Sequence, residues 1–239
     1  YSRCDILFAQ SKTLVKILKK RYKKKTILIP NWSEEISEKK INIKLQKKLN
    51  KYIDKSKINI FFGGNIGKAQ DFDSIIKAIE LTNKQTNKFN WYIFGEGSEK
   101  FRIQNYILSK NNLKNIYFFH SVPQNELLYV FKKYSDFLLV SLLKSKALKW
   151  TIPGKIQFYL QCKKPIVGML DGEANSLIVK SDSGFVVNSG NYISFSRLLM
   201  KLTTLNKKNY LKKKKINGYN YSKNFFNKKK VIKDLKFYL

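Results

Sequence analysis

Residues 150–173 read WTIPGKIQFYLQCKKPIVGMLDGE and predict a loop, a helix, a buried strand and an acidic turn in direct succession. Pro153 suits the first position of the helix because proline lacks the N–H that would be unpaired there, and Gly154 lets the backbone approach a ligand. Lys155 adds a positive charge to a helix end whose free N–H groups and dipole already attract anions. The stretch therefore predicts a phosphate-binding turn in an α/β protein.

The acidic turn consists of Asp171, Gly172 and Glu173, and it follows the apolar run Pro165–Met169, which predicts a buried strand. In open α/β sheets, ligands bind just beyond the carboxyl ends of the strands. We therefore expect the acidic turn to lie on the same edge of the sheet as the phosphate-binding turn.

Apolar runs alternate with segments of helical periodicity along most of the chain, which predicts a Rossmann-like parallel sheet with helices on both faces. The expected strands are Ile6–Ala9, Thr26–Ile29, Ile58–Phe62, Trp91–Phe94, Ile116–Phe119, Phe137–Ser141, Pro165–Met169 and Gly184–Val187. The expected helices are Lys12–Lys20 (capped by Ser11), Asp73–Thr82, Lys100–Lys110, Gln124–Tyr134, Pro153–Cys162, Asn175–Ser181 and Tyr192–Thr204.

These elements divide the chain into three parts. Residues 1–57 contain a first strand–helix–strand unit and a linker, residues 58–206 form the Rossmann-like domain, and residues 207–239 form one or two Lys-rich helices. Residues 34–57 carry few apolar side chains, so we expect a linker with some helix and not a part of the core.

The composition indicates a packed domain, because 43% of the 239 residues are apolar and 14% are aromatic. No apolar run approaches the ~20 residues that a membrane-spanning helix needs. Cys4 and Cys162 lie in different expected elements with apolar neighbours, so we expect two reduced, packed thiols, as in cytosolic proteins.

The formal charge of +32 is typical of proteins that bind nucleic acid or anionic membranes. Lys outnumbers Arg by 44 to 4, however, which is also what a strongly AT-rich genome would encode on solvated surfaces. The Lys clusters lie in separate segments and no nucleic-acid-binding motif accompanies them. We therefore expect no nucleic-acid partner and leave contact with an anionic membrane surface open.

A second glycine-rich loop, residues 63–70, lies between an expected strand and an expected helix. Gly64 and Gly67 allow the backbone to approach phosphate oxygens, while Asn65 and Lys68 offer polar contacts. The loop matches neither a Walker A motif nor a dinucleotide-binding motif, and a plain tight turn is the alternative interpretation.

Further candidates follow other strands on the same edge. Glu96 lies in a Gly-Glu-Gly turn, and His120 and Val122 follow the next strand, although a structural role is the commoner one for a single histidine. The stretch 141–150 is expected to be a long loop beside the pocket. No cluster of His, Cys or carboxylates has metal-ligand spacing.

Taken together, these motifs resemble the donor-binding half of family-4 glycosyltransferases of the GT-B fold. More narrowly, they are similar to the bacterial branch that includes N-acetylfucosamine transferases of O-antigen and capsule assembly. The segments that carry the resemblance are Gly64–Gln70, Gly95–Glu99, Val122-Pro123, Ser141–Lys144, Thr151–Gln157 and Asp171–Glu173. Each motif is weak by itself, but their shared order over nearly the whole chain is specific.

The resemblance implies a two-domain, retaining enzyme whose C-terminal half binds a nucleotide sugar, usually a UDP-sugar, without an obligatory metal or other cofactor. Lys68 and Lys155 would then be the catalytic residues, stabilising the departing nucleoside diphosphate. The implied donor-binding residues are Gly64, Asn65, Gly67 and Gly154 at the diphosphate, Glu96, His120 and Val122 at the base, and Asp171, Gly172 and Glu173 at the sugar or ribose.

The chain departs from the family pattern in two ways. Trp150 and Phe158 stand where most of the wider family has two glutamates, which leaves Gln157 or Glu173 as candidate ribose ligands. The family's N-terminal domain, which holds the acceptor site, is expected before Tyr1, so we expect this chain alone to be inactive. Residues 207–239 would pack back toward that domain.

The leading hypothesis is transfer of a hexosyl or N-acetylhexosaminyl group to a lipid-linked or saccharide acceptor in cell-envelope polysaccharide synthesis. The enzyme would be cytoplasmic and peripheral at the inner membrane. A UDP-sugar 2-epimerase of the same fold is one alternative, and it would convert its substrate without an acceptor. A basic lipid- or nucleic-acid-binding module without catalysis is another, with steeply salt-dependent binding.

Overall fold

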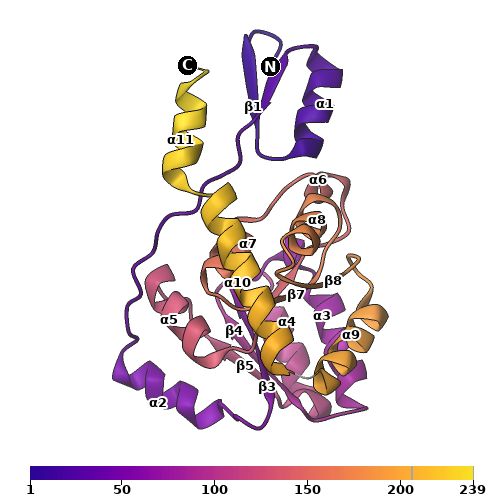
Figure 1. The fold of residues 1–239 in the computed structure, drawn as a ribbon. Coiled ribbons are helices and arrows are strands. Elements are labelled where there is room, and N and C mark those ends of the chain that lie inside the picture. The colour runs from indigo at the N-terminus through magenta and orange to yellow at the C-terminus, as the bar shows by residue number, and fades with distance from the viewer. Residues whose placement is uncertain (206, 239) are drawn as a thin grey trace.

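A computed structural model describes residues 1–205 and 207–238 and shows a large α/β body with a smaller unit above it (Figure 1). The strands are β1 (Ile6–Ala9), β2 (Lys25–Leu28), β3 (Ile58–Gly63), β4 (Phe89–Phe94), β5 (Ile116–Phe119), β6 (Phe137–Ser141), β7 (Ile166–Met169) and β8 (Gly184–Val187). The helices are α1 (Lys12–Tyr22), α2 (Ile43–Tyr52), α3 (Phe72–Asn83), α4 (Lys100–Leu108), α5 (Gln124–Tyr134), α6 (Lys146–Lys149), α7 (Gly154–Gln161), α8 (Gly172–Lys180), α9 (Tyr192–Thr204), α10 (Lys207–Phe225) and α11 (Lys228–Lys236).

The body contains a six-stranded parallel sheet with the strand order β5-β4-β3-β6-β7-β8. Each strand is a short apolar run, and the four inner strands, β4, β3, β6 and β7, are buried along their whole length because helices cover both faces. The strand order reverses between β3 and β6, and ligands of such sheets bind beyond the carboxyl ends at that point. The expected Rossmann-like architecture is confirmed.

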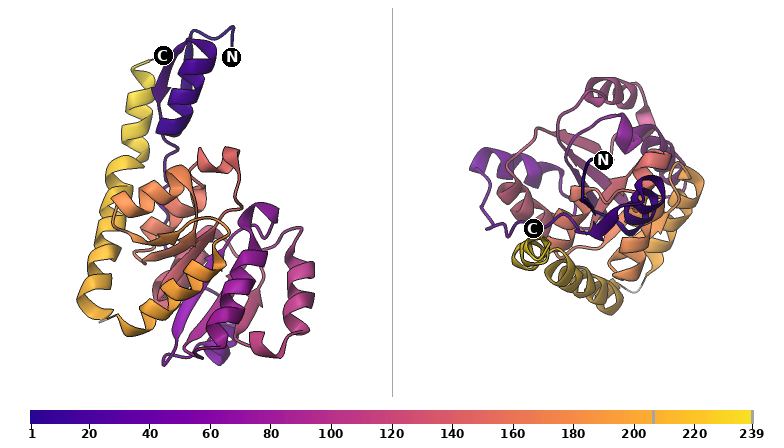
Figure 2. Two further views of the ribbon diagram at one scale, coloured as in Figure 1. Left: turned by 90° about the vertical axis from the view of Figure 1, so that its right-hand side faces the viewer. Right: turned by 90° about the horizontal axis from the view of Figure 1, so that it is seen from above.

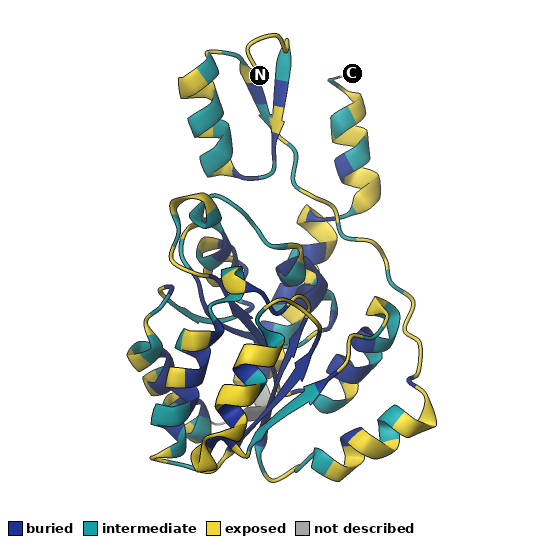
Figure 3. Cartoon of the chain, turned by 180° about the vertical axis from the view of Figure 1, so that it is seen from behind, coloured by how far each residue is buried: buried dark blue, intermediate teal, exposed yellow. Residues whose placement is uncertain are grey.

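Two hydrophobic clusters fill the space on either side of this sheet. The helices α2, α5, α7 and α8 contribute to one cluster, and α3, α4 and α9 contribute to the other. Figure 3 shows the buried residues concentrated in the sheet and on the inner faces of these helices. No helix in the described part of the chain is long and apolar enough to span a membrane.

The prediction that residues 34–57 stay outside the core was wrong. Helix α2 lies in this segment, and Ile41 and Leu49 are buried in the hydrophobic cluster beside the sheet. The backbone carbonyl of Tyr52 also accepts a hydrogen bond from the buried Tyr92 hydroxyl at 2.7 Å. Leu45 and Tyr52 also pack against this cluster, so Ile41, Leu45, Leu49 and Tyr52 form one apolar stripe at helical spacing, which the many lysines around it obscured.

Helix α8 begins three residues earlier than expected, and the 141–150 loop contains the short helix α6. Asp171 is therefore the N-cap residue of α8, and Gly172 and Glu173 form its first turn. The presence of Gly172 suggested a loop, but a glycine is compatible with the first turn of a helix.

The smaller unit consists of the parallel pair β1-β2 and α1, which Ser11 caps by accepting a hydrogen bond from Leu14 N–H at 3.2 Å. The Ser11 hydroxyl also donates to the Trp150 carbonyl of the body. Helix α11 lies beside this unit (Figure 2), where the Tyr238 ring is 6.4 Å from that of Phe8.

The chain crosses between the unit and the body at two adjacent places. Ser33 lies in the segment that follows β2, and Asn227 is the N-cap residue of α11. The two residues form an isolated β-bridge. The Ser33 N–H donates to the Phe226 carbonyl at 2.8 Å, and the Gln161 amide donates to the Ser33 hydroxyl. The linker and the C-terminal helices are thus joined to each other and to α7.

Candidate functional site

A cavity of about 470 Å³ lies at the carboxyl edge of the sheet, where the loops after β3, β4 and β5 meet the first turns of α5 and α7. It is lined by Gly63, Gly64, Asn65, Phe94, Gly95, Glu96, Ser121, Val122, Gln124, Leu127, Gly154, Lys155 and Phe158. The structure therefore brings together six of the residues that the sequence singled out, namely Gly64, Asn65, Glu96, Val122, Gly154 and Lys155.

The loop after β3 is held by a buried tyrosine of α7. The Tyr159 hydroxyl accepts a hydrogen bond from the Gly63 N–H at 2.9 Å and lies 3.2 Å from the Gly63 carbonyl, to which it donates. Burial raises the pKa of this phenol, so the hydroxyl keeps its proton. Tyr159 therefore fixes the end of β3 relative to α7, and both elements contribute residues to the cavity lining.

The loops after β3 and β4 touch through their backbones. A Cβ atom on Gly95 would lie 1.9 Å from the Gly64 carbonyl oxygen, and Gly95 has a φ of +154°. Both the contact and the backbone conformation require glycine at this position. The close approach places the Glu96 turn directly beside Gly64.

Lys155 lies at the N-terminal end of α7, facing the loop after β3. Its ammonium nitrogen is 3.6 Å from the centre of the Phe62 ring, and its Cε atom would be 3.1 Å from a Cβ on Gly64. No described carboxylate forms an ion pair with it, and burial lowers the pKa of Lys155 to about 7. The first turn of α7 has no side-chain cap in the described structure. The N-terminal end of α7 thus combines an uncompensated lysine with free donors, an arrangement that favours an anion.

Glu96 and His120 lie at the outer rim of the cavity. One Glu96 carboxylate oxygen is 2.8 Å from the Lys100 ammonium and 3.0 Å from His120 Nδ1. These two hydrogen bonds hold the pKa of Glu96 below its ordinary value, and the bond from Lys100 has the larger effect. The His120 side chain is 90% exposed and does not line the cavity, whereas Ser121 and Val122 do.

Lys68 and Gly67 line a different hollow of about 370 Å³ beside the main cavity. The other residues of that hollow are Asp71, Phe72, Asp73, Glu99, Arg102 and Leu143. Arg102 is bound there to Asp73 at 2.9 Å and to Glu99 at 2.8 Å. The structure thus separates the two lysines that the sequence grouped together, and the catalytic role of Lys68 stays a prediction.

The remaining candidates lie outside the cavity lining and make contacts within the protein. The Glu173 carboxylate accepts the Thr13 N–H of α1 at 2.6 Å, and the Gln157 amide donates to the Asn31 carbonyl at 2.9 Å. Asp171 accepts from the Ser189 N–H at 3.3 Å and pairs with Lys149 at 3.4 Å. A Cβ on Gly172 would lie 2.0 Å from the Lys149 carbonyl. These residues connect the body with the smaller unit and with neighbouring loops.

Sequence reasoning missed several residues of the site. Tyr159 gave no separate signal, because an aromatic side chain inside an apolar helix predicts only packing. Ser121 and Gln124 border the Val122-Pro123 motif, and their proximity to it was the available clue. Leu127 and Phe94 became identifiable only once α5 and β4 were placed side by side around the cavity.

The cavity therefore combines an anion-attracting end at α7 with an apolar middle and polar groups at the end of β5. In the described residues, no three His, Cys, Asp or Glu side chains are grouped so that they would hold a metal ion. A metal-independent reaction stays a prediction. This arrangement suits an elongated ligand that carries phosphate at one end.

A family model described as "Glycosyl transferases group 1" matches residues 42–221. Solved structures similar to the chain include the pneumococcal O-GlcNAc transferase GtfA in complex with UDP and GlcNAc (TM-score 0.72, 13% identity, 98% of this chain and 44% of that chain). They also include Anabaena Alr3699/HepE in complex with UDP and glucose (TM-score 0.75, 12% identity, 98% and 62%). A third is WaaG, a glycosyltransferase involved in lipopolysaccharide biosynthesis (TM-score 0.71, 14% identity, 96% and 62%).

These structural similarities establish the C-terminal half of the GT-B fold for this chain. The chain spans less than two thirds of the length of each of these three proteins. A comparison with curated protein sequences gives no significant match.

Proposed function

Since this chain belongs to the group 1 glycosyl transferases, we propose that its cavity binds the nucleoside diphosphate of a nucleotide-sugar donor, most simply a UDP-sugar. The observation that carries the proposal is the unpaired Lys155 ammonium beside the backbone of Gly64, at the N-terminal end of α7. The complexes of GtfA and HepE with UDP support the choice of nucleotide.

In this proposal each part of the cavity has a separate task. Lys155, Gly154 and Gly64 bind the diphosphate, and Lys155 stabilises the negative charge that develops on it as the sugar leaves. Asn65 and the neighbouring hollow of Lys68 lie next to this end. Ser121, Val122 and Gln124 border the base at the end of β5.

For the whole protein, we propose a retaining transfer of a hexosyl or N-acetylhexosaminyl group to a lipid-linked or saccharide acceptor. The similarity to WaaG supports a role in cell-envelope polysaccharide synthesis, including O-antigen or capsule. The motifs that resemble family-4 enzymes support the narrower assignment within the group.

Calorimetric titration of the chain with UDP tests the proposed site. We expect UDP to bind and uridine, which lacks phosphates, to bind much more weakly, because Lys155 and the α7 end contact only the diphosphate. Equal heats and affinities for UDP and uridine would contradict the diphosphate assignment, and the absence of UDP binding would contradict the function.

The pH dependence of UDP binding provides a further prediction. In the free chain the Lys155 pKa is about 7, and a bound diphosphate favours the charged ammonium and raises that pKa. Above pH 7, binding must therefore be accompanied by proton uptake, and affinity should fall by up to about tenfold per pH unit between pH 7 and 9. Titrations of the native chain and of Lys155→Met at pH 7, 8 and 9 check this. Equal slopes for the two proteins would exclude Lys155 as the titrating group.

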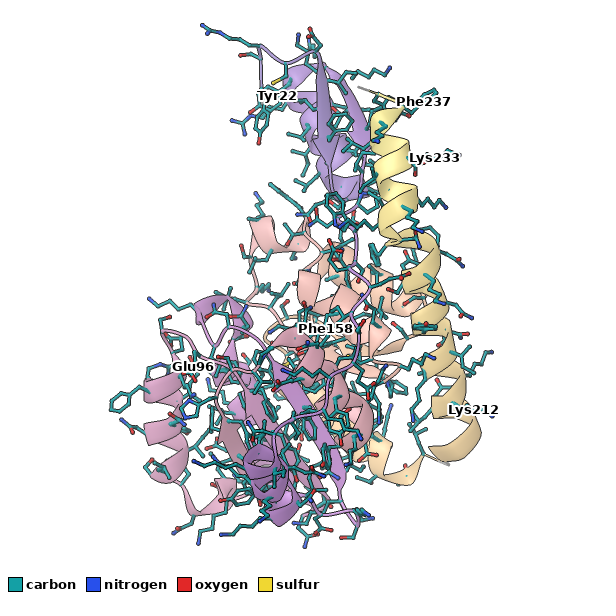
Figure 4. The ribbon with its side chains drawn as sticks, turned by 90° about the vertical axis from the view of Figure 1, so that its left-hand side faces the viewer. Tyr22, Glu96, Phe158, Lys212, Lys233 and Phe237 are labelled. Atoms are coloured by element: carbon teal, nitrogen blue, oxygen red, sulfur yellow. The ribbon has the colours of Figure 1, made fainter. Side chains whose placement is uncertain are left out.

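We further propose that the end of the molecule formed by the smaller unit and α11 binds an anionic membrane surface. Residues 1–29 contain nine Lys or Arg and residues 228–238 contain five, against two acidic residues, Asp5 and Asp234. Figure 4 shows Tyr22, Lys233 and Phe237 at this end. Phe237 is 83% exposed, and an exposed Phe among lysines can insert at the boundary between headgroups and acyl chains.

We expect the chain to sediment with vesicles that contain phosphatidylserine and not with pure phosphatidylcholine vesicles. Each Lys near such a surface contributes about 1 kcal/mol, so the triple variant Lys229→Glu, Lys233→Glu, Lys236→Glu should bind at least tenfold more weakly. The matched control replaces three exposed lysines at the opposite edge of the sheet by glutamate, namely Lys84, Lys88 and Lys114. If both triple variants lose binding equally, the attraction is a property of net charge and not of this end.

A further inference from the structure

The middle of the cavity is apolar, in contrast to its two ends. Phe94, Leu127 and Phe158 line it between the Lys155 end and the end of β5, and their exposed fractions are 1%, 9% and 6%. Phe158 follows Gly154 by four residues, so its side chain lies one turn along the same face of α7. A nucleotide with its diphosphate at Gly154 and its base at the end of β5 would place its ribose against this middle section.

The Phe158 ring is held in place by other rings. Its centre lies 5.9 Å from that of Phe131 and 6.1 Å from that of Tyr159, and Tyr159 is itself fixed by Gly63. The wall is therefore packed and contains no group that exchanges hydrogen bonds with a sugar hydroxyl. Figure 4 shows Phe158 inside the body, and Glu96 beside α4.

The polar side chains that line the cavity either contact other groups of the protein or lie at the two ends of the cavity. Glu96 is the one carboxylate among the described lining residues, and its Oε1 atom is bound to Lys100 and His120 at the rim. The Asn65 amide extends toward Gly67 and Gly97, where its Nδ2 and Oδ1 atoms would lie 2.8 and 2.6 Å from added Cβ atoms. Ser121 lies in the loop after β5 and Gln124 is the first residue of α5, so both are at the far end of the cavity from Lys155.

From these contacts we propose that the chain discriminates little between ribose and 2′-deoxyribose, with Phe158 as the residue that sets this tolerance. The inference rests on the proposed nucleoside-diphosphate site. A site that hydrogen-bonds a substrate hydroxyl rejects the analogue without it, because its own polar groups are left unpaired. An apolar wall loses no hydrogen bond when the hydroxyl is absent.

Calorimetry with UDP and 2′-deoxy-UDP tests the proposal, since the two nucleotides differ only in the 2′-hydroxyl. We expect dissociation constants that agree within threefold. A preference of tenfold or more for UDP would overturn the inference while leaving the proposed function intact. If neither nucleotide binds, the proposed function fails and the inference fails with it.

The variant Phe158→Glu tests whether Phe158 is the responsible residue. It introduces a carboxylate acceptor into the middle of the cavity and should create a preference for UDP over 2′-deoxy-UDP of at least fivefold. Phe101→Glu is the matched control, because Phe101 is 75% exposed on α4 and the substitution changes the net charge equally. The control should keep the ratio of the UDP and 2′-deoxy-UDP dissociation constants that the native chain shows.

Phe158→Gln provides the same test with a neutral acceptor if the glutamate variant does not fold, as judged by circular dichroism. A folded Phe158→Glu or Phe158→Gln protein that binds UDP and still shows no preference would overturn the assignment of Phe158 to the ribose. A preference that also appears in Phe101→Glu would overturn it as well.

Discussion

Replacement of Lys155 by methionine is expected to weaken UDP binding by roughly 10- to 150-fold. A hydrogen bond to a charged group contributes about 1.5 to 3 kcal/mol, and the Lys155 ammonium has no carboxylate that would lessen its attraction for a diphosphate. Methionine keeps an apolar stem against Phe62 and Gly64, so the cavity wall is preserved. Calorimetric titration with UDP at pH 7 measures the effect.

Lys68→Met is the matched control, because it removes the same charge from the neighbouring hollow. We expect a change of about threefold or less, as for an exposed lysine whose interaction is screened by solvent. The opposite result, a large loss for Lys68→Met and none for Lys155→Met, would move the diphosphate out of the cavity and into the hollow beside it.

The same Lys155→Met variant is expected to be more stable than the native chain at pH 7. The unfolded chain keeps the Lys155 proton up to a pKa of 10.5, whereas the folded chain releases it near 7. Between these pH values the unfolded state binds more protons, so the stability of the native chain rises with pH. The difference in free energy of unfolding between Lys155→Met and the native chain, measured in urea, should therefore be largest at pH 7 and below. It should become smaller toward pH 10.

Replacement of Gly95 by alanine is expected to destabilise the fold by roughly 2 to 6 kcal/mol. The new Cβ would lie 1.9 Å from the Gly64 carbonyl oxygen, and the φ of +154° is unfavourable for any side chain. The loss is large against a typical domain stability of about 5 to 15 kcal/mol. The midpoint of urea unfolding, followed by circular dichroism, measures it.

Gly154→Ala is the control for this prediction. A Cβ on Gly154 would meet only the Gln157 Oε1 atom, at 4.0 Å, so its stability should stay within about 1 kcal/mol of the native value. Equal midpoints for the two alanine variants would show that the loops after β3 and β4 do not approach each other as closely as the structure indicates.

The strands of the body could be predicted from sequence because each is a short apolar run whose signal is local. Helix α2 was underestimated, because its apolar stripe of Leu45, Leu49 and Tyr52 is short and is surrounded by lysines. The same limit applies to the site. The glycine loops and Lys155 carry their chemistry in adjacent residues, whereas the target of Glu173 is Thr13, 160 positions away.

The two lysines show the same limit most directly. Lys68 and Lys155 each follow a glycine near a strand or helix end, and their local sequences predict the same role. Only the packing of α7 against the loop after β3 distinguishes them, because it places Lys155 over Phe62 and leaves Lys68 in another hollow. Phe158 was noted as a departure from a family pattern, but the apolar wall to which it belongs is formed by three elements.

The β-bridge between Ser33 and Asn227 joins both covalent connections to the smaller unit and α11 at one place. The smaller unit and the C-terminal segment are thus linked twice, at this bridge and through the rings of Phe8 and Tyr238. The smaller unit makes two further contacts with the body, Ser11 with the Trp150 carbonyl and Thr13 with Glu173. Trp150 lies four residues before Gly154, so the smaller unit supplies a hydrogen-bond partner to the segment that leads directly to Lys155.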